Sequence, residues 1–290
     1  MDIELLKTFL EVEKTRHFGR AAENLYLTQA AVSSRIRQLE NVLGVNLFNR
    51  HRNNINLTSA GERFKPYAES IATSWSRAVQ EVSLGANQSL QITIGGTPNL
   101  WDSLLQDYLH QLYRHFPGIV LRAVAQDRES LIRQQLSHTM DIAIMFDPPK
   151  LEELKVEKTH TVKLLLVTTY KDVTFDKIFN HPYVQIDWGT SFNIQHSKYF
   201  EITQPPTMHT STGRIALDFM LDNGGSAYLP ESIAQPYIAN DQLHLLEEAP
   251  EIDREVYTAY LKSSDKREHL EKIVQLFTLI EPESAPTLQP

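Results

Sequence analysis

The hydrophobic residues at the start of the chain recur every three or four positions. This spacing predicts an amphipathic helix over residues 2–14, with an inward face made of Ile3, Leu6, Phe9 and Leu10. The segment HFGRAAENL predicts a second, short helix, and YLT is the turn that follows it. A third helix is predicted from Gln29 to about Leu43, with Thr28 as its N-cap and Gly44 as its C-cap.

The third predicted helix has two faces of opposite character. At about 100° per residue, a narrow apolar stripe contains Val32, Ile36, Leu39 and Leu43. The opposite face is small, hydroxylated and basic, and it contains Ala30, Ser33, Ser34, Arg37 and Gln38. Such a face suits the major groove of DNA, because small side chains let the backbone approach while Gln, Ser and Arg can read base edges.

Arg35 lies between these two faces, nearer to the buried stripe than Arg37 does. We therefore expect Arg35 to meet a phosphate or a neighbouring carboxylate, and Arg37 to face the groove. The unpaired N–H groups at the start of the helix, near Thr28 and Gln29, also favour a phosphate.

A basic hairpin follows the third helix. The segment VNLFNRHRNNINLT alternates apolar residues around Asn53-Asn54, a pair that tolerates the dihedral angles of a tight turn. Arg50, His51 and Arg52 stand beside that turn. A short helix, a turn, a longer helix and then a hairpin are typical of a winged helix-turn-helix, whose wing contacts phosphates or the minor groove.

The segment TSAGERFKPYAESIATSWSRAVQEVS predicts one long helix. Ser59 and Glu62 fit a capping box, although Thr58 competes for the cap, and Pro66 should bend the helix slightly. Its apolar residues form a seam too long for a three-helix domain to cover, which favours dimerisation over packing within one chain. The predicted dimer contacts are Phe64, Tyr67, Ile71, Trp75, Ala78 and Val82.

The next two hundred residues predict a β-α-β-α-β unit with a parallel sheet. The strands are SLQITIGG, IVLRAVAQ and DIAIMF, and the first helix has Thr97 as N-cap and Pro98 at its first position. Further strands are VKLLLVTTY, SAYLP and REVYTAYLKSS, with a helix in TSTGRIALDFMLDNGG and a last helix over 265–280. A ligand is expected beyond the carboxyl ends of the parallel strands, near Thr97, Arg128 and Phe146.

Composition and charge limit the class of protein. The chain has 290 residues, no cysteine, 41% hydrophobic and 22% charged residues. These values predict a soluble protein of two domains, or of three if one is small, without disulfides or thiolate metal sites. Since neither a long apolar run nor a signal peptide is evident, we expect a cytoplasmic protein. Residues 1–68 carry ten Lys or Arg against seven Asp or Glu within a chain of net charge −8, which favours an anionic partner for this segment alone.

The block FGRAAENLYLTQAAVSSRIRQLENVLGVNLFNR, followed by LTSAG, resembles the LysR-type transcriptional regulators. The resemblance implies a winged helix-turn-helix domain over 1–58 and a linker helix over 59–88. It implies an α/β effector domain over 89–290, similar to periplasmic binding proteins, with subdomain I at 90–160 and 264–282 and subdomain II at 161–263. The fold class is therefore α+β and α/β together.

The resemblance also implies partners and contacts. The partners are double-stranded DNA, a second copy of the chain, a homotetramer built from two dimers, and RNA polymerase, with flagellar genes among the targets. The DNA contacts are then Thr28, Gln29, Ala30, Ser33, Ser34, Arg35, Arg37, Gln38, Arg50, Arg52 and Asn53. Three departures stand out: Ala30 replaces a common proline, Ser34-Arg35 replaces arginine followed by an amide or histidine, and Asn53-Asn54 replaces arginines.

The implied effector is a small molecule, and no metal or cofactor is expected. The resemblance places its pocket at Thr97, Asn99, Arg128, Phe146, Thr210 and Ser211. A helix start after Thr97 favours a carboxylate. However, Phe146 stands where some members have a basic residue, so the pocket prefers a less charged ligand or has lost its ligand. Trp101 and Trp188 are interpreted as core residues, with Trp188 in a loop as the better candidate for ligand stacking.

Two other classes compete with a regulator. An enzyme is disfavoured because no H-E-x-x-H, G-x-S-x-G, G-x-G-x-x-G or P-loop motif occurs. A solute-binding protein would need a secretion signal and no helix-turn-helix. An effector-independent repressor with a vestigial pocket stays open as an alternative.

Overall fold

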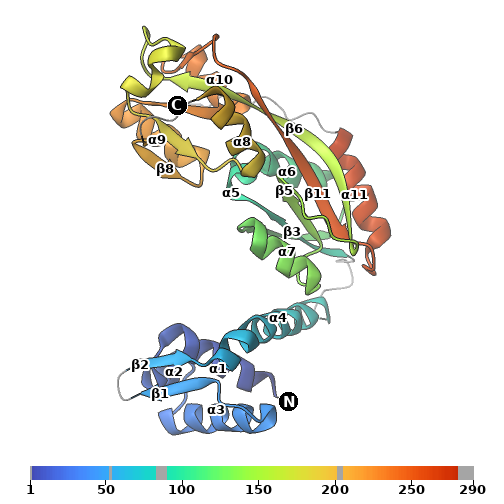
Figure 1. Ribbon diagram of the computed structural model, residues 1–290. Helices are drawn as coiled ribbons and strands as arrows, with labels where there is room; N and C mark the ends of the chain where they lie inside the picture. The colour runs from blue at the N-terminus through green and yellow to red at the C-terminus, as the bar shows by residue number, and fades with distance from the viewer. Residues whose placement is uncertain (1, 52–53, 83–89, 201–204, 280–290) are drawn as a thin grey trace. The chain divides into compact units, whose positions relative to one another are not determined.

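The computed structural model describes residues 2–51, 54–82, 90–200 and 205–279. The chain divides into two compact units, Met1–Ala86 and Asn87–Pro290 (Figure 1). The predicted helices and strands of the first unit are all present. It contains α1 (Ile3–Thr15), α2 (Phe18–Asn24), α3 (Gln29–Leu43), the hairpin strands β1 (Phe48–His51) and β2 (Asn54–Leu57), and α4 (Ser59–Val82).

Local signals in the sequence set the ends of these helices. The Thr28 hydroxyl accepts a hydrogen bond from the backbone N–H of Ala31 (3.2 Å), and Gly44 adopts the left-handed conformation that ends α3. Thr58 rather than Ser59 caps α4, because its hydroxyl accepts from the N–H of Gly61 at 3.0 Å. Pro66 lies inside α4, and positions 83–88 of the predicted linker helix lie outside the described residues.

One residue of the predicted hairpin turn lies in a strand instead. His51 pairs with Asn54, so Asn54 belongs to β2 and is not part of the turn predicted around Asn53-Asn54. Asn54 instead opens β2, where its position in the register fixes it opposite the end of β1. Arg52 and Asn53 themselves lie outside the described residues.

The second unit is built on a seven-stranded mixed sheet. Its strand order is β10-β6-β11-β5-β3-β4, with β9 also paired to β6. The predicted parallel part consists of β3 (Leu90–Gly96) between β4 (Ile119–Ala125) and β5 (Ile142–Met145). The long strands β6 (Leu154–Thr168) and β11 (Ile252–Leu261) run antiparallel, side by side through this unit (Figure 1).

Two lobes share these long strands. The first lobe has β3, β4 and β5 with α5 (Pro98–Leu100), a π-helical turn (Trp101–Leu105), α6 (Gln106–His115), α7 (Arg128–Leu136) and α11 (Arg267–Leu279). The second lobe has the 3-10 turn Phe175–Asn180, β7 (Val184–Ile186), α8 (Thr190–Tyr199), β8 (Met208–Thr210), α9 (Gly213–Asn223), β9 (Ser226–Pro230), α10 (Glu231–Ala239) and β10 (His244–Leu245). A continuous apolar core runs through both lobes and includes Ile94, Leu105, Trp188 and Leu229.

Several elements of this unit were not predicted. The turn Phe175–Asn180, β7, α8, β8, α10 and β10 were absent from the sequence analysis, because each is short and its apolar pattern is weak. The predicted loop around Trp188 ends at Gly189, and α8 begins at Thr190. Thr97 occupies the predicted N-cap position, yet its buried hydroxyl has no hydrogen-bond partner among the described residues and does not cap the helix.

Candidate functional sites

The exposed face of α3 carries the side chains predicted to contact DNA. Val32, Ile36 and Leu39 are fully buried against the core of the first unit. This burial turns the opposite face outward, where Thr28, Gln29, Ala30, Ser34, Arg37 and Gln38 are exposed and Ser33 is half-buried. The Nε–H of Arg37 donates to the Ser33 carbonyl at 3.3 Å, which directs the guanidinium along the outer face of the helix.

Arg35 occupies a different position from Arg37. One guanidinium nitrogen lies 3.3 Å from the Thr8 hydroxyl and 3.6 Å from a carboxylate oxygen of Glu4, both on α1. The side chain therefore links α3 to α1 within the unit. Lys65 makes a similar link between α4 and α1 through Glu13, at 2.8 Å.

Glu40 holds the start of the wing and was missed by the sequence analysis. Its side chain is buried, and one carboxylate oxygen accepts from the backbone N–H groups of Leu47 (2.8 Å) and Phe48 (3.4 Å). Because Phe48 opens β1, this contact fixes the hairpin relative to α3. The signal in the sequence that could have identified Glu40 is a carboxylate next to the apolar stripe of α3. Arg50 lies on β1 opposite Ile55.

The apolar seam of α4 splits into two parts. Ala68 is buried, and Phe64 packs edge-on against Phe9 with ring centroids 5.3 Å apart. Phe64 therefore belongs to the core of its own unit, which corrects its assignment to the dimer seam. The rest of the seam is exposed on the outer part of the helix, and it comprises Tyr67, Ile71, Trp75, Ala78, Val79 and Val82.

A cleft of about 500 Å³ lies between the two lobes of the second unit. Five of the six residues predicted for an effector line it, namely Thr97, Asn99, Arg128, Phe146 and Ser211. Thr210 instead lines a neighbouring cavity of about 660 Å³ with Gln185 and His196. Trp188 does not line the cleft. It is fully buried and donates its indole N–H to the Tyr228 carbonyl at 3.0 Å, so it is a core residue.

The amide of Asn99 joins the lobes. It donates to the Asp187 carbonyl (3.0 Å) and accepts from the N–H of Gly213 (2.8 Å) at the start of α9. The side chain is only 3% exposed, so its polar atoms serve the protein itself. Trp101 packs against the core in a comparable way, with its indole N–H bonded to the Val124 carbonyl.

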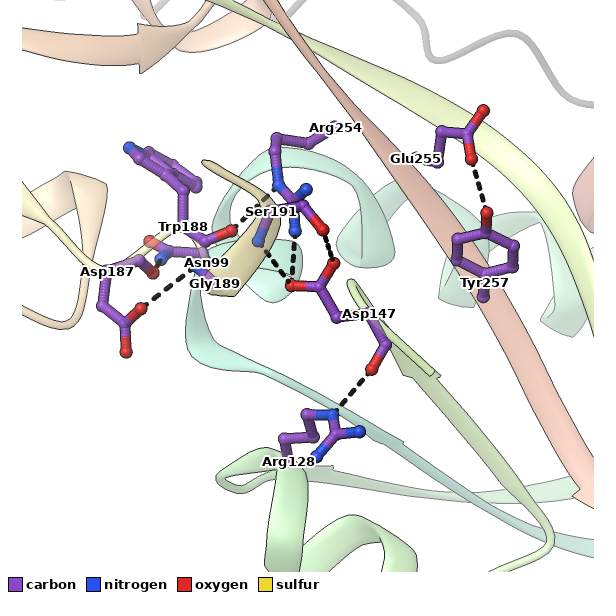
Figure 2. Close-up of polar contacts among 10 residues, drawn as sticks. All are labelled: Asn99, Arg128, Asp147, Asp187, Trp188, Gly189, Ser191, Arg254, Glu255 and Tyr257. Carbon is purple, nitrogen blue, oxygen red and sulfur yellow. Dashed lines mark hydrogen bonds and ion pairs between the residues drawn. The ribbon is translucent and has the colours of Figure 1, made fainter. Parts of the chain in front are cut away.

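Asp147 lines the cleft and is the centre of a network of hydrogen bonds (Figure 2). Its carboxylate accepts from the Ser191 hydroxyl (2.5 Å), the Ser191 backbone N–H (3.4 Å) and the Arg254 guanidinium (2.8 Å). Its carbonyl accepts from Nε of Arg128 at 2.6 Å. Burial alone would raise the pKa of Asp147, but the hydrogen bonds from Ser191 and Arg254 outweigh burial and hold the pKa below its usual value.

Two family models match the chain across both units. Residues 3–62 match the bacterial regulatory helix-turn-helix protein of the lysR family, and residues 85–278 match the LysR substrate binding domain. The chain belongs to the LysR family. It is a DNA-binding transcriptional regulator with a helix-turn-helix and an effector-binding domain.

Relatives and solved structures agree with this family. The HTH-type transcriptional regulator HdfR of Yersinia enterocolitica is 40% identical over 284 residues, 95% of this chain and 96% of that protein. HdfR of Yersinia pestis strain Pestoides F is equally similar. Full-length CbnR bound to its target DNA has the same fold, with a TM-score of 0.76, 16% identity and coverage of 96% and 100%. Vibrio fischeri DarR in complex with DNA matches with a TM-score of 0.59, 21% identity and coverage of 97% and 99%.

Two other kinds of feature are absent from the described residues of this LysR-family regulator. Among the described residues, no helix is long and apolar enough to cross a membrane. Within the same ranges, no group of three or more His, Cys, Asp or Glu side chains could hold a metal ion.

Two members of the Asp147 network were missed by the sequence analysis. They are Ser191 and Arg254, which were not considered. Ser191 lies 44 positions and Arg254 lies 107 positions from Asp147 along the chain. No local pattern connects residues at such separations. A lone arginine within the apolar strand REVYTAYL was the available signal, because a buried arginine needs a partner.

Proposed function

We propose that this regulator reads promoter DNA with α3 in the major groove. Gln29, Ala30, Ser33, Ser34, Arg37 and Gln38 approach base edges, and Thr28 and the wing residues Arg50, Arg52 and Asn53 approach the backbone. The observation that carries the proposal is the outward face of α3, which is small and polar while Val32, Ile36 and Leu39 are buried behind it. An α-helix with such a face fits the major groove, and phosphate contacts add affinity without sequence preference.

The exposed seam of α4 supports a dimer as the DNA-binding unit. Trp75 is 52% exposed and Val82 is 89% exposed in the single chain, and large apolar side chains in a row favour burial against a second copy. Each dimer presents its two DNA-binding units to successive major grooves, and two dimers join through their effector domains into a homotetramer. We place this assembly in the cytoplasm, with RNA polymerase as its partner at the promoter.

The cleft between the lobes supports control by a small molecule. A ligand that binds one arrangement of the lobes more tightly than another shifts the population of arrangements. This shift would change the spacing between the DNA-binding units of the assembly. One observation favours the alternative of a regulator without an effector: Asn99 and Asp147 both use their polar atoms within the protein. A thermal-shift screen of uncharged, cationic and anionic metabolites separates these two functions.

Genome-wide footprinting with the purified full-length protein tests the DNA-binding proposal. We expect discrete protected sites with two half-sites related by a two-fold axis, with flagellar promoters among them. Uniform protection without sequence preference would contradict base reading by α3. The Arg37→Ala variant serves as the matched control, because it should keep phosphate contacts while losing sequence preference.

A further inference from the structure

We propose that the cleft contains an anion-binding position that the chain fills with its own carboxylate, that of Asp147. The regulator should then respond only to ligands without a carboxylate. This inference rests on the proposed role of the cleft as a ligand site, and it names the chemical class that the site accepts. Asp147 is the residue that determines this specificity.

The donors around Asp147 are those that would bind a free carboxylate. Ser191 lies in the first turn of α8 and supplies both a hydroxyl and a backbone N–H, while Arg254 supplies a guanidinium N–H. A helix N-terminus together with an arginine is a common site for small anions. Here these donors, from α8 and β11, converge on the carboxylate of Asp147, which follows the end of β5 (Figure 2).

Arg254 makes the position a preformed site. The residue is only 3% exposed, its Nε donates to the Trp188 carbonyl at 2.9 Å, and its guanidinium carbon lies 5.0 Å from the ring centre of Phe146. A buried guanidinium without a partner is strongly unfavourable. The position therefore requires an anion at all times, and Asp147 provides one in every molecule.

The backbone on both sides is shaped to place this carboxylate. Asp147 has a positive φ of 39°, which non-glycine residues rarely adopt, and its carbonyl is held by Arg128. Gly189 faces it with a φ of 89°, and a Cβ there would lie 2.6 Å from a carboxylate oxygen of Asp147 and 3.0 Å from the Arg254 guanidinium. The carboxylate occupies space that only a glycine leaves free.

The remaining surface of the cleft also disfavours an anion. Asp127, Glu129 and Asp187 line it together with Asp147, whereas Arg128 is the cation among its lining residues. A carboxylate ligand would have to displace Asp147 and then remain close to the displaced charge. An uncharged or cationic ligand avoids both costs, so the cleft selects for that class.

The proposal can be tested by removing the Asp147 carboxylate and supplying acetate in its place. Asp147→Gly removes the carboxylate and tolerates the positive φ, and we expect its melting temperature to fall by about 5 to 10 °C in the full-length protein. Acetate should then raise it again by about 3 °C at roughly 0.1 M, if the vacated position binds acetate with a Kd near 10 mM. Sodium chloride of equal ionic strength is the reference.

The wild type and Glu129→Gln are the matched controls, and neither should be stabilised by acetate relative to chloride. Equal stabilisation of wild type and Asp147→Gly would overturn the proposal, and so would an Asp147→Gly protein that acetate does not stabilise. If Asp147→Gly folds only poorly, refolding yield with and without acetate gives the same readout.

Gly189→Ala offers an independent test through a double-mutant comparison. The added Cβ should displace the Asp147 carboxylate, so the loss of melting temperature in Gly189→Ala/Asp147→Gly should be smaller than the sum of the single losses. Fully additive losses overturn the proposal. None of these measurements uses DNA or an effector, so their failure can be distinguished from a failure of the proposed regulatory function, which footprinting reports separately.

Discussion

The guanidinium of Arg35 lies 3.6 Å from the carboxylate of Glu4, so it faces the body of the winged unit. Arg37, two residues further along α3, is exposed on the outer face. The helix period accounts for this difference, since two positions turn a side chain by about 200°. The two arginines should therefore differ in their roles at the DNA.

Arg37→Ala should reduce sequence preference, with a loss of about 1–3 kcal/mol in binding free energy at a matched site and a smaller loss at unrelated DNA. Arg35→Ala is the matched control. It should leave the preference for the matched site unchanged and lower stability by no more than about 1 kcal/mol, because its ion pair with Glu4 is largely solvated. Gel-shift titrations on a footprinted site and on a scrambled site measure both. If Arg37→Ala and the wild type prefer the footprinted site over the scrambled site equally, Arg37 does not read base edges.

The exposed seam of α4 predicts a change in oligomeric state. Trp75→Glu places a charge at the middle of the seam and should shift the protein toward monomers, because burial of an unpaired carboxylate in an apolar interface is costly. Ser74→Glu introduces the same charge at an exposed neighbouring position off the seam and should leave the assembly unchanged. Sedimentation velocity over a range of concentrations distinguishes the two. Identical behaviour of both variants would place the dimer contact elsewhere.

Glu40 should stabilise the start of the wing. Glu40→Ala leaves the backbone N–H groups of Leu47 and Phe48 without this acceptor, which should cost about 1–3 kcal/mol in local stability. Hydrogen exchange should accelerate at these two amides. Glu40→Gln keeps an acceptor oxygen and should retain most of the protection. If exchange at Leu47 is the same in Glu40→Ala as in the wild type, the wing is positioned by other contacts.

The sequence alone predicted the helices and strands of the first unit well, because the signals for them lie within each element. Each helix of this unit carries its own period of apolar residues and its own cap, such as Thr28 and Gly44 on α3. The choice between Thr58 and Ser59 as the cap of α4 needed the structure, since both have a hydroxyl at a plausible position. Phe64 was misassigned because the spacing of apolar residues is the same whether a helix packs inward or against a second chain.

The second unit shows the limit of local patterns. The parallel strands β3, β4 and β5 were predicted, because they form near-continuous apolar runs between helical segments. The cleft residue Asn99 was located through the family resemblance, and Phe146 was located both through the resemblance and through its place at the end of a predicted strand. Their hydrogen bonds and packing depend on Asp187, Gly213 and Arg254, which lie far away in the sequence. Such contacts follow only from the arrangement of the two lobes.

The buried imidazole of His196 predicts a loss of stability in mild acid. The residue is 2% exposed, and burial lowers its pKa to about 4, while its ring nitrogen lies 2.7 Å from the Tyr183 hydroxyl. The unfolded chain has the ordinary histidine pKa of about 6.5 and binds a proton more readily. The stabilising contribution is therefore complete above pH ~6.5 and is lost as the pH falls toward 4, by up to about 3 kcal/mol.

Urea unfolding of the full-length protein between pH 4 and 7 measures this dependence. His196→Gln keeps a hydrogen-bonding side chain near Tyr183 but cannot take up a proton, so its unfolding free energy should fall less steeply over this range than that of the wild type. His209→Gln is the matched control, because this histidine is exposed on β8 and its removal should leave the slope unchanged. A wild-type slope that survives in His196→Gln would assign the acid sensitivity to other groups. The half-buried carboxylate of Asp147 acts in the same direction at a lower pH, because its folded pKa lies below its usual value.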